Sequence, residues 1–134
     1  MSDNLIKFHL PAQGLTGTAT ARNFSWTLDE PEDVGGANQG PMPTEAVYAA
    51  LGGCVAITLR LYAQRKEWDL GEIDVVVKAV ENEHRQKEIH KKISFGNKDL
   101  TDDQIKRLHQ IASKCPVSKL LQQATPVILN ENLG

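Results

Sequence analysis

The chain has few cysteines and little excess charge. Its 134 residues include two cysteines, 15 basic and 17 acidic residues, giving a net charge of −2. Because the basic residues are scattered, no electrostatic surface for nucleic acid or an anionic membrane is indicated. The locally basic segment 84–92 is diluted by glutamate and favours a solvated hairpin over a binding patch. A chain of this length fits a single domain, 1–134, with a core that needs no disulfide bonds.

Targeting and membrane segments are also missing. Residues 1–10 contain no apolar core long enough for a secretion signal. The most hydrophobic stretch, 46–63, is interrupted by a glycine pair, Thr58 and Arg60, so we do not expect it to span a membrane. We therefore expect a soluble, cytoplasmic protein, in which a lone cysteine pair is more often redox-active or incidental than structural.

Several motifs that bind nucleotides or metals are absent from the sequence. There is no Gly-x-Gly-x-x-Gly after a strand, no P-loop and no Gly-x-Ser-x-Gly elbow, so nucleotide binding and serine-hydrolase chemistry lack support. The four histidines show no ligand spacing with one another or with a cysteine: His9, His84, His90 and His109. We therefore expect neither a metal site nor a bound cofactor.

The N-terminal third of the chain is typical of β structure. Short runs at 5–10, 15–21 and 24–28 are separated by residues that favour turns, and they predict three strands. The following segment, 29–43, is dense in glycine and proline and cannot continue a strand or a helix. We expect it to form a structured loop that leads into the next element.

A long helix is predicted after this loop. Pro43 suits the first helical turn, Thr44 can cap, and Glu45 places a negative charge at the positive end of the helix. Between Ala46 and Tyr62 nearly every side chain is apolar or small. A helix that is apolar all round is buried on all sides. Because one small domain can hardly surround such a helix, we expect a partner subunit to complete its burial.

The C-terminal half alternates between strand and helix patterns. Apolar residues alternate over 73–79 and again over 89–95, which predicts a β-hairpin. Residues 101–104 read Thr-Asp-Asp-Gln, a capping box that opens a helix. Cys115-Pro116 begins a further short helix, and 126–129 can supply a last strand. The predicted fold class is α+β.

Cys54 follows Gly52 and Gly53 in the predicted central helix. Each glycine costs about 1 kcal/mol relative to alanine inside a helix. Such a cost is tolerated where another helix or a substrate must approach the backbone, and the sequence leaves both explanations open. Cys54 itself is either a small core residue or a reactive thiol that packing shields and aims.

Cys115 lies in a different chemical setting. With Pro116 as the first helical residue, the sulfur takes the cap position, where backbone N–H groups and the helix dipole favour a thiolate. We therefore expect the pKa of Cys115 to be lowered. If the fold brings both cysteines together, the chain has a dithiol that can cycle with a disulfide.

Taken together, these segments resemble the OsmC/Ohr family of osmotically induced and organic hydroperoxide resistance proteins. The resemblance extends over nearly the whole chain and is carried by Asp29-Glu30-Pro31, Gly35-Gly36, Gly40-Pro41, Pro43-Thr44-Glu45, Ala49-Ala50-Leu51-Gly52-Gly53-Cys54 and Lys114-Cys115-Pro116-Val117. It implies an OsmC-like α+β fold with antiparallel sheets and a long buried central helix. It also implies an intertwined homodimer with its sites at the subunit interface.

The resemblance further implies thiol-dependent reduction of organic hydroperoxides, an antioxidant activity. Cys54 matches the family's peroxidatic cysteine, whose thiolate attacks the peroxide and becomes a sulfenic acid. Cys115 matches the resolving cysteine, which condenses with it to a disulfide. Small dithiols or lipoylated proteins then act as the external reductant.

The chain departs from the best-characterised peroxidases of the family in two places. Those proteins carry an arginine in the loop before the central helix, whereas residues 29–45 contain none. Their glutamate directly follows the proline that opens the helix. Here Thr44 stands there, and Glu45 comes one place later, about 100° further round the helix. We retain Glu45 as a candidate catalytic residue beside the thiols, with Arg22 as an alternative cation, in a subfamily without the usual arginine.

Two other readings of the cysteine pair remain. The glycine pair and the missing arginine favour a non-catalytic OsmC-like dimer that binds a small apolar ligand at the subunit interface. A purely structural dimer would show neither thiol reactivity nor a ligand.

Overall fold

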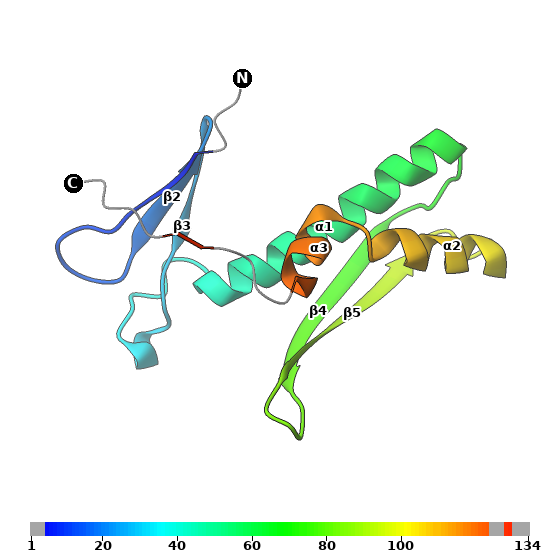
Figure 1. The fold of residues 1–134 in the computed structure, drawn as a ribbon. Helices are drawn as coiled ribbons and strands as arrows, with labels where there is room; N and C mark the ends of the chain where they lie inside the picture. Colours follow the sequence, from blue (N-terminus) through cyan, green and yellow to red (C-terminus); the bar gives the residue numbers. More distant parts are fainter. Residues whose placement is uncertain (1–4, 124–127, 130–134) are drawn as a thin grey trace. The chain divides into compact units, whose positions relative to one another are not determined.

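The computed structural model describes residues 5–123 and 128–129. Contacts within the chain divide it into two compact units, residues 1–48 and 49–134. Each unit has its own antiparallel sheet, and helix α1 (Pro43–Lys66) begins in the first unit and continues into the second (Figure 1). The fold class is therefore α+β, with a long helix following the N-terminal strands.

The first unit contains a three-stranded sheet in the order β1-β2-β3. Its strands are β1 (Ile6–His9), β2 (Gly17–Ala21) and β3 (Phe24–Leu28), all within the predicted runs. Arg22 lies in the tight turn between β2 and β3 with a φ of 54°, and its guanidinium carbon is 4.8 Å from the centre of the Phe24 ring. The structure therefore places Arg22 in a cation–π contact within this turn.

The loop after β3 is built around the buried carboxylate of Asp29. This carboxylate accepts a hydrogen bond of 2.7 Å from the Thr16 hydroxyl, and further bonds from the amides of Glu30, Ala37 and Gln39. The Thr16 bond and the three amide bonds outweigh the effect of burial and lower the pKa of Asp29 to about 2. The segment includes a short 3-10 helix, Glu32–Val34, and it is the structured loop that its composition predicts.

Helix α1 begins at Pro43, two residues earlier than a Thr44 cap would require. The carboxylate of Glu45 accepts a hydrogen bond of 2.8 Å from the amide of Met42 and so supplies one half of a capping box. The predicted cap at Thr44 is therefore wrong. Because proline has no N–H group to satisfy, the helix starts at Pro43, and Thr44 lies inside its first turn.

The second unit is a β-hairpin with helices packed on one face. Strand β4 (Ile73–Glu81) pairs with β5 (Lys87–Phe95), and Val77 lies opposite Lys91 in the register. Helices α2 (Asp102–Ala112) and α3 (Pro116–Gln122) follow. The hydrophobic core is formed by residues from α1, the hairpin and the segment from α2 to Cys115: Leu51, Val55, Leu59, Tyr62, Ala63, Leu70, Phe95, Leu108, Ala112 and Cys115. On the opposite face of the hairpin Val76 is 63% exposed.

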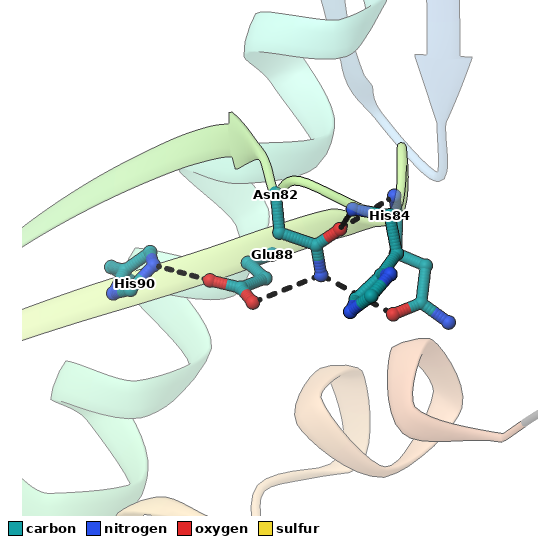
Figure 2. Close-up of polar contacts among 5 residues, drawn as sticks. Asn82, His84, Glu88 and His90 are labelled. Atoms are coloured by element: carbon teal, nitrogen blue, oxygen red, sulfur yellow. Dashed lines mark hydrogen bonds and ion pairs between the residues drawn. The ribbon is translucent and has the colours of Figure 1, made fainter.

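The turn of this hairpin is held by Asn82 (Figure 2). Its side-chain oxygen accepts hydrogen bonds of 2.9 Å from the amides of His84 and Gln86, and its Nδ2 donates to Gln86 and Glu88. The hydrogen bond from Asn82, and after it that with His90, lower the pKa of Glu88. The basic segment is therefore an exposed hairpin, as its composition predicts, with a turn that fixes which strand residues face each other.

Helix α1 is buried along one side within this unit. Val55 and Leu59 are fully buried, whereas Ile57 is 63% and Leu61 51% exposed. The hairpin covers a single face of the helix, so one chain does not provide the burial on all sides that its composition predicts. Against the buried side, strand β4 reaches Gly52, so the approaching element there is a strand rather than another helix.

Three further predictions concern a membrane span, a capping box and a last strand. Among residues 5–123 and 128–129, α1 is the one helix whose length and mean hydropathy of 1.5 fit a membrane crossing, a criterion that core helices of water-soluble proteins also meet. The capping box at α2 is confirmed, with Thr101 and Gln104 bonded reciprocally. Half of the strand predicted over 126–129 lies outside the described residues, and the described half, residues 128–129, is not in a strand.

Candidate dithiol site

Cys54 lies on α1 in the second unit and is half-buried. It packs against the hydrophobic core on one side. The neighbouring Gly53 faces open space, since a Cβ atom there would meet no atom within 4 Å. Cys54 is therefore a thiol with packing on one side and access on the other.

Cys115 occupies the N-cap of α3 and has no exposed surface. Its Sγ accepts a hydrogen bond of 3.3 Å from the amide of Ser118 and lies 3.0 Å from the Ser118 hydroxyl oxygen. Pro116 takes the first helical position, where its missing N–H costs nothing, and the sulfur caps the amide of the third helical residue, Ser118. The structure therefore confirms the predicted cap.

The two thiols lie close enough for each to affect the pKa of the other. Both cysteines are free, and no disulfide joins them. Helix α1 supplies one sulfur and the start of α3 supplies the other. Residues 61 positions apart in the sequence thus form a reduced dithiol.

Burial raises the pKa of Cys54, and the contact with Cys115 raises it further. Hydrogen bonds from the backbone of Val117 and the hydroxyl of Thr58 act in the opposite direction without reversing the net shift. The accessible thiol of the pair therefore keeps its proton.

The pKa of Cys115 shifts downward. Burial raises it, but the hydroxyl and amide of Ser118 stabilise the thiolate, with help from the Cys54 thiol and the charge of Lys91. The negative charge of the singly ionised pair therefore resides on the buried sulfur. Cys54 is thus the more accessible thiol, and Cys115 is the more acidic one.

Lys91 reaches this site from strand β5. Its Nζ donates a hydrogen bond of 3.3 Å to the Oγ of Ser118, whose side chain is 3% exposed. Both residues line a cavity of about 230 Å³. Its remaining lining consists of three aliphatic residues, one lysine and one glutamine: Leu51, Ile89, Leu121, Lys87 and Gln122.

The other candidate residues lie in the first unit. Glu45 is exposed in the first turn of α1, where its carboxylate bonds the Met42 amide, and Arg22 lies in the β2–β3 turn. The structure therefore brings together Cys54 and Cys115, and it describes Glu45 in a capping contact. Within residues 5–123 and 128–129, no cluster of three His, Cys, Asp or Glu side chains could hold a metal ion.

Sequence reasoning did not identify Ser118 or Lys91. Ser118 stands three residues after the cap cysteine, the spacing at which a capping side chain meets backbone and side-chain partners. Lys91 interrupts the inward-facing row of Ile89, Ile93 and Phe95 on the predicted hairpin. A lysine in an apolar row is a signal for a buried partner, and here the partner is a hydroxyl bonded to a thiol.

This arrangement is suited to two-electron redox chemistry. Oxidation of the accessible sulfur would give a sulfenic acid directly beside a second thiol, and condensation of the two gives a disulfide. The charge on Cys115 favours that second step, because the thiolate is the nucleophile in disulfide formation.

Comparison with known proteins agrees with the fold. The family model described as OsmC-like protein matches residues 36–130. No curated protein sequence matches the chain.

Solved structures with the same fold come from several bacteria. A Psychrobacter arcticus protein, to which an osmotic stress and detoxification role is attributed, is 24% identical with a TM-score of 0.77, covering 92% of this chain and 91% of its own. The OsmC-like protein from Mycoplasma pneumoniae is 21% identical with a TM-score of 0.70, covering 92% and 89%. The organic hydroperoxide resistance protein OhrB of Bacillus subtilis is 20% identical with a TM-score of 0.59, covering 90% and 92%.

These structural matches share the α+β arrangement of antiparallel sheets and a long central helix. The family model spans more than half of the chain, including both cysteine motifs. The protein therefore belongs to the OsmC-like family.

Proposed function

We propose that the protein reduces organic hydroperoxides by a dithiol–disulfide cycle of Cys54 and Cys115, as part of antioxidant defence in the cytoplasm. The observation that carries this proposal is the proximity of a half-buried thiol to a fully buried, charge-stabilised thiol. The family supports the substrate class, because it includes an organic hydroperoxide resistance protein.

In the proposed reaction, the sulfur of Cys54 attacks the terminal oxygen of the hydroperoxide. The O–O bond breaks, an alcohol leaves, and Cys54 becomes a sulfenic acid. Cys115 then attacks this sulfenic acid, which forms the disulfide and releases water. The two thiols are oxidised by two electrons, the peroxide is reduced by two, and an external dithiol restores the pair by exchange.

We propose a lipoyl group or another small dithiol as this reductant. A dithiol regenerates a protein disulfide in two intramolecularly linked exchange steps, whereas a monothiol needs two separate encounters. Half-buried Cys54 is the sulfur that such a reductant reaches first, since Cys115 has no exposed surface.

We further propose that the active form is a homodimer. Support comes from α1, where Ile57 and Leu61 are more than half exposed. Gly53, four residues before Ile57, also faces open space. Residues four apart share a helix face, so this side of α1 presents an apolar surface that a second subunit could cover. Glu45 is the proposed third residue of the site.

Rapid mixing of the reduced protein with an alkyl hydroperoxide tests the proposal. We expect both thiols of each chain to disappear and to return on addition of a dithiol. Cys54→Ser should abolish the reaction, and Cys115→Ser should stop it at a sulfenic acid that dimedone traps. An unchanged thiol content after prolonged exposure to excess hydroperoxide would reject the function.

A non-catalytic dimer that binds a small apolar ligand is the second candidate function. The apolar Ile57 and Leu61 on α1, and the absence of arginine from residues 29–45, favour it. Native mass spectrometry of freshly purified protein separates the two functions. A retained ligand together with thiols inert to hydroperoxide would favour binding over catalysis.

A further inference from the structure

Three polar groups lie in a row behind the accessible cysteine. The Nζ of Lys91 is 3.3 Å from the Oγ of Ser118, and that oxygen is 3.0 Å from the Sγ of Cys115. The row starts at the cavity wall and ends at a sulfur with no exposed surface. These three residues come from β5, α3 and the cap before α3.

The chemistry of the three groups fixes the direction of the first hydrogen bond, and the protonation state of Cys115 decides the second. A lysine ammonium can only donate, so the oxygen of Ser118 accepts from Lys91. The single hydroxyl proton of Ser118 is then free to point at Cys115, which as a thiolate can only accept. The Ser118 amide donates to the same sulfur. A thiolate at Cys115 can therefore accept from both the hydroxyl and the amide of Ser118, whereas a protonated Cys115 can instead donate to the Ser118 oxygen.

The surroundings contain few other groups that could play this part. Cys54 faces Cys115 from α1, and Lys91 faces it from β5. The inward residues of β4 beside the thiols, Val75 and Val77, are apolar, as are the buried residues of α2. Lys87 lines the same cavity but makes none of the side-chain hydrogen bonds seen in the described part of the chain.

We propose that Lys91 and Ser118 form a relay that holds the negative charge of the reduced dithiol on Cys115, which then serves as the internal base for Cys54. This inference rests on the proposed hydroperoxide reaction for its chemical steps. Ser118 touches the reacting sulfur directly. Lys91 is a positioning residue, because it acts through the Ser118 hydroxyl.

The proton movements balance over the whole reaction. The Cys54 thiol passes its proton to the Cys115 thiolate as its sulfur attacks the terminal peroxide oxygen and the O–O bond breaks. The departing alkoxide takes that proton from Cys115 and leaves as an alcohol. Cys115, again a thiolate, attacks the sulfenic sulfur and expels hydroxide, which solvent protonates to water. One buried sulfur thus acts as base, acid and resolving nucleophile in turn.

The relay offers a substitute for a charge that the loop lacks. Residues 29–45 contain no arginine, so no guanidinium from that segment can hold a thiolate. A lysine that acts through a hydroxyl places its charge on the second cysteine instead of the first. Activation of Cys54 then comes from its thiol neighbour.

The test compares four variants by ultraviolet thiolate absorbance over about pH 5 to 10, and by their rate of oxidation with an alkyl hydroperoxide. Lys91→Met removes the charge, Lys91→Arg restores a donor and a charge, and Ser118→Ala removes the hydroxyl. Lys87→Met is the matched control, since it removes a lysine from the same cavity and the same strand face without touching the relay. Circular dichroism and Tm establish that each variant is folded.

We expect the first thiolate of Lys91→Met and Ser118→Ala to appear about one pH unit higher than in the wild type. Their oxidation at pH 7 should be about tenfold slower and should approach the wild-type rate at high pH, because base restores the missing thiolate. Lys91→Arg should recover most of the shift. Lys87→Met should leave both readouts unchanged.

An equal thiolate titration in wild type, Lys91→Met and Ser118→Ala would overturn the relay, even if the hydroperoxide reaction proceeds. An equal shift in Lys87→Met would also overturn it, since the effect would then reflect general positive charge in the cavity. If the dithiol is inert to hydroperoxide, both the proposed function and the proton-transfer steps are rejected. The absorbance titration then still decides whether the relay holds the charge.

Discussion

The backbone of Gly52 lies against Val77 so closely that an added Cβ atom would sit 3.4 Å from the Cγ2 of that valine. This contact joins the middle of α1 to strand β4, about two turns before Leu59 and two residues before Cys54 on the helix. The glycine pair therefore has two different roles. Gly52 allows the sheet to approach, while Gly53 leaves open the surface next to the accessible thiol.

Alanine substitutions at these two positions should have unequal effects. Gly53→Ala is expected to raise the free energy of unfolding by about 1 kcal/mol, because alanine favours the helix and meets no neighbour. Gly52→Ala should gain less, since Val77 must yield slightly. Urea unfolding at several protein concentrations measures both. A loss of stability in Gly53→Ala that depends on concentration would mean that a second subunit packs against this position.

The two cysteines should differ in how fast they are alkylated. A bulky maleimide is expected to label Cys54 before Cys115, even though the pKa of Cys115 is the lower one, because Cys115 has no exposed surface. Mass spectrometry of tryptic peptides at several times resolves the two sites. Cys54→Ser should label slowly until denaturant is added. Fast labelling of Cys115 in that folded variant would contradict the burial of its sulfur.

The Asp29 loop should make stability depend on pH in the acid range. The pKa of Asp29 is about 2 in the folded chain, below the ordinary value of 3.8, so the unfolded chain binds the proton more readily. The contribution of the carboxylate is therefore fully present above about pH 5 and is lost as the pH falls towards 2. We expect Asp29→Asn to have a lower Tm than wild type at neutral pH, with the difference shrinking below about pH 4.

Asp33→Asn is the control for this measurement. Asp33 is an exposed carboxylate in the same loop, within the short 3-10 helix. Its removal should shift the Tm little at any pH. A Tm difference between wild type and Asp29→Asn that stays constant down to about pH 2 would show that the carboxylate charge contributes nothing.

Two substitutions of Glu45 separate helix capping from chemistry. Glu45→Ala should lower the free energy of unfolding by about 1 kcal/mol, because the Met42 amide loses its acceptor. Glu45→Gln keeps an acceptor oxygen and should lose less, since only the charge at the helix N-terminus disappears. If Glu45 takes part in the proposed reaction, Glu45→Gln should still slow oxidation by hydroperoxide. Unchanged kinetics in the folded glutamine variant would restrict Glu45 to capping.

Local patterns in the sequence predict much of the second unit. Alternation over 73–79 and 89–95 gives the hairpin and its inward face, and Thr101 gives the start of α2. Cys115-Pro116 gives a cap with a lowered thiol pKa, because the chemistry of that position depends on neighbours within one turn. These features succeed because each is decided by residues close together in the chain.

Features that depend on distant partners could not be predicted in the same way. Contact of Lys91 with Ser118 joins residues 27 positions apart, and it requires the hairpin and α3 to meet at a particular register. The division of access and charge between Cys54 and Cys115 likewise arises from packing rather than from either motif. At the start of α1, two competing caps are offered by adjacent residues, and Glu45 rather than Thr44 makes the bond.

The tight turn at Asn82 has a consequence for the distant sulfur. Side chains of a strand alternate between its two faces, so a slip of one residue in the pairing of Val77 with Lys91 would rotate the ammonium to the outer face. Asn82, directly after the end of β4, anchors that pairing through bonds across the turn to Gln86 and Glu88. Lengthening or shortening the tip of the hairpin would therefore tune the acidity of a cysteine that the tip never touches.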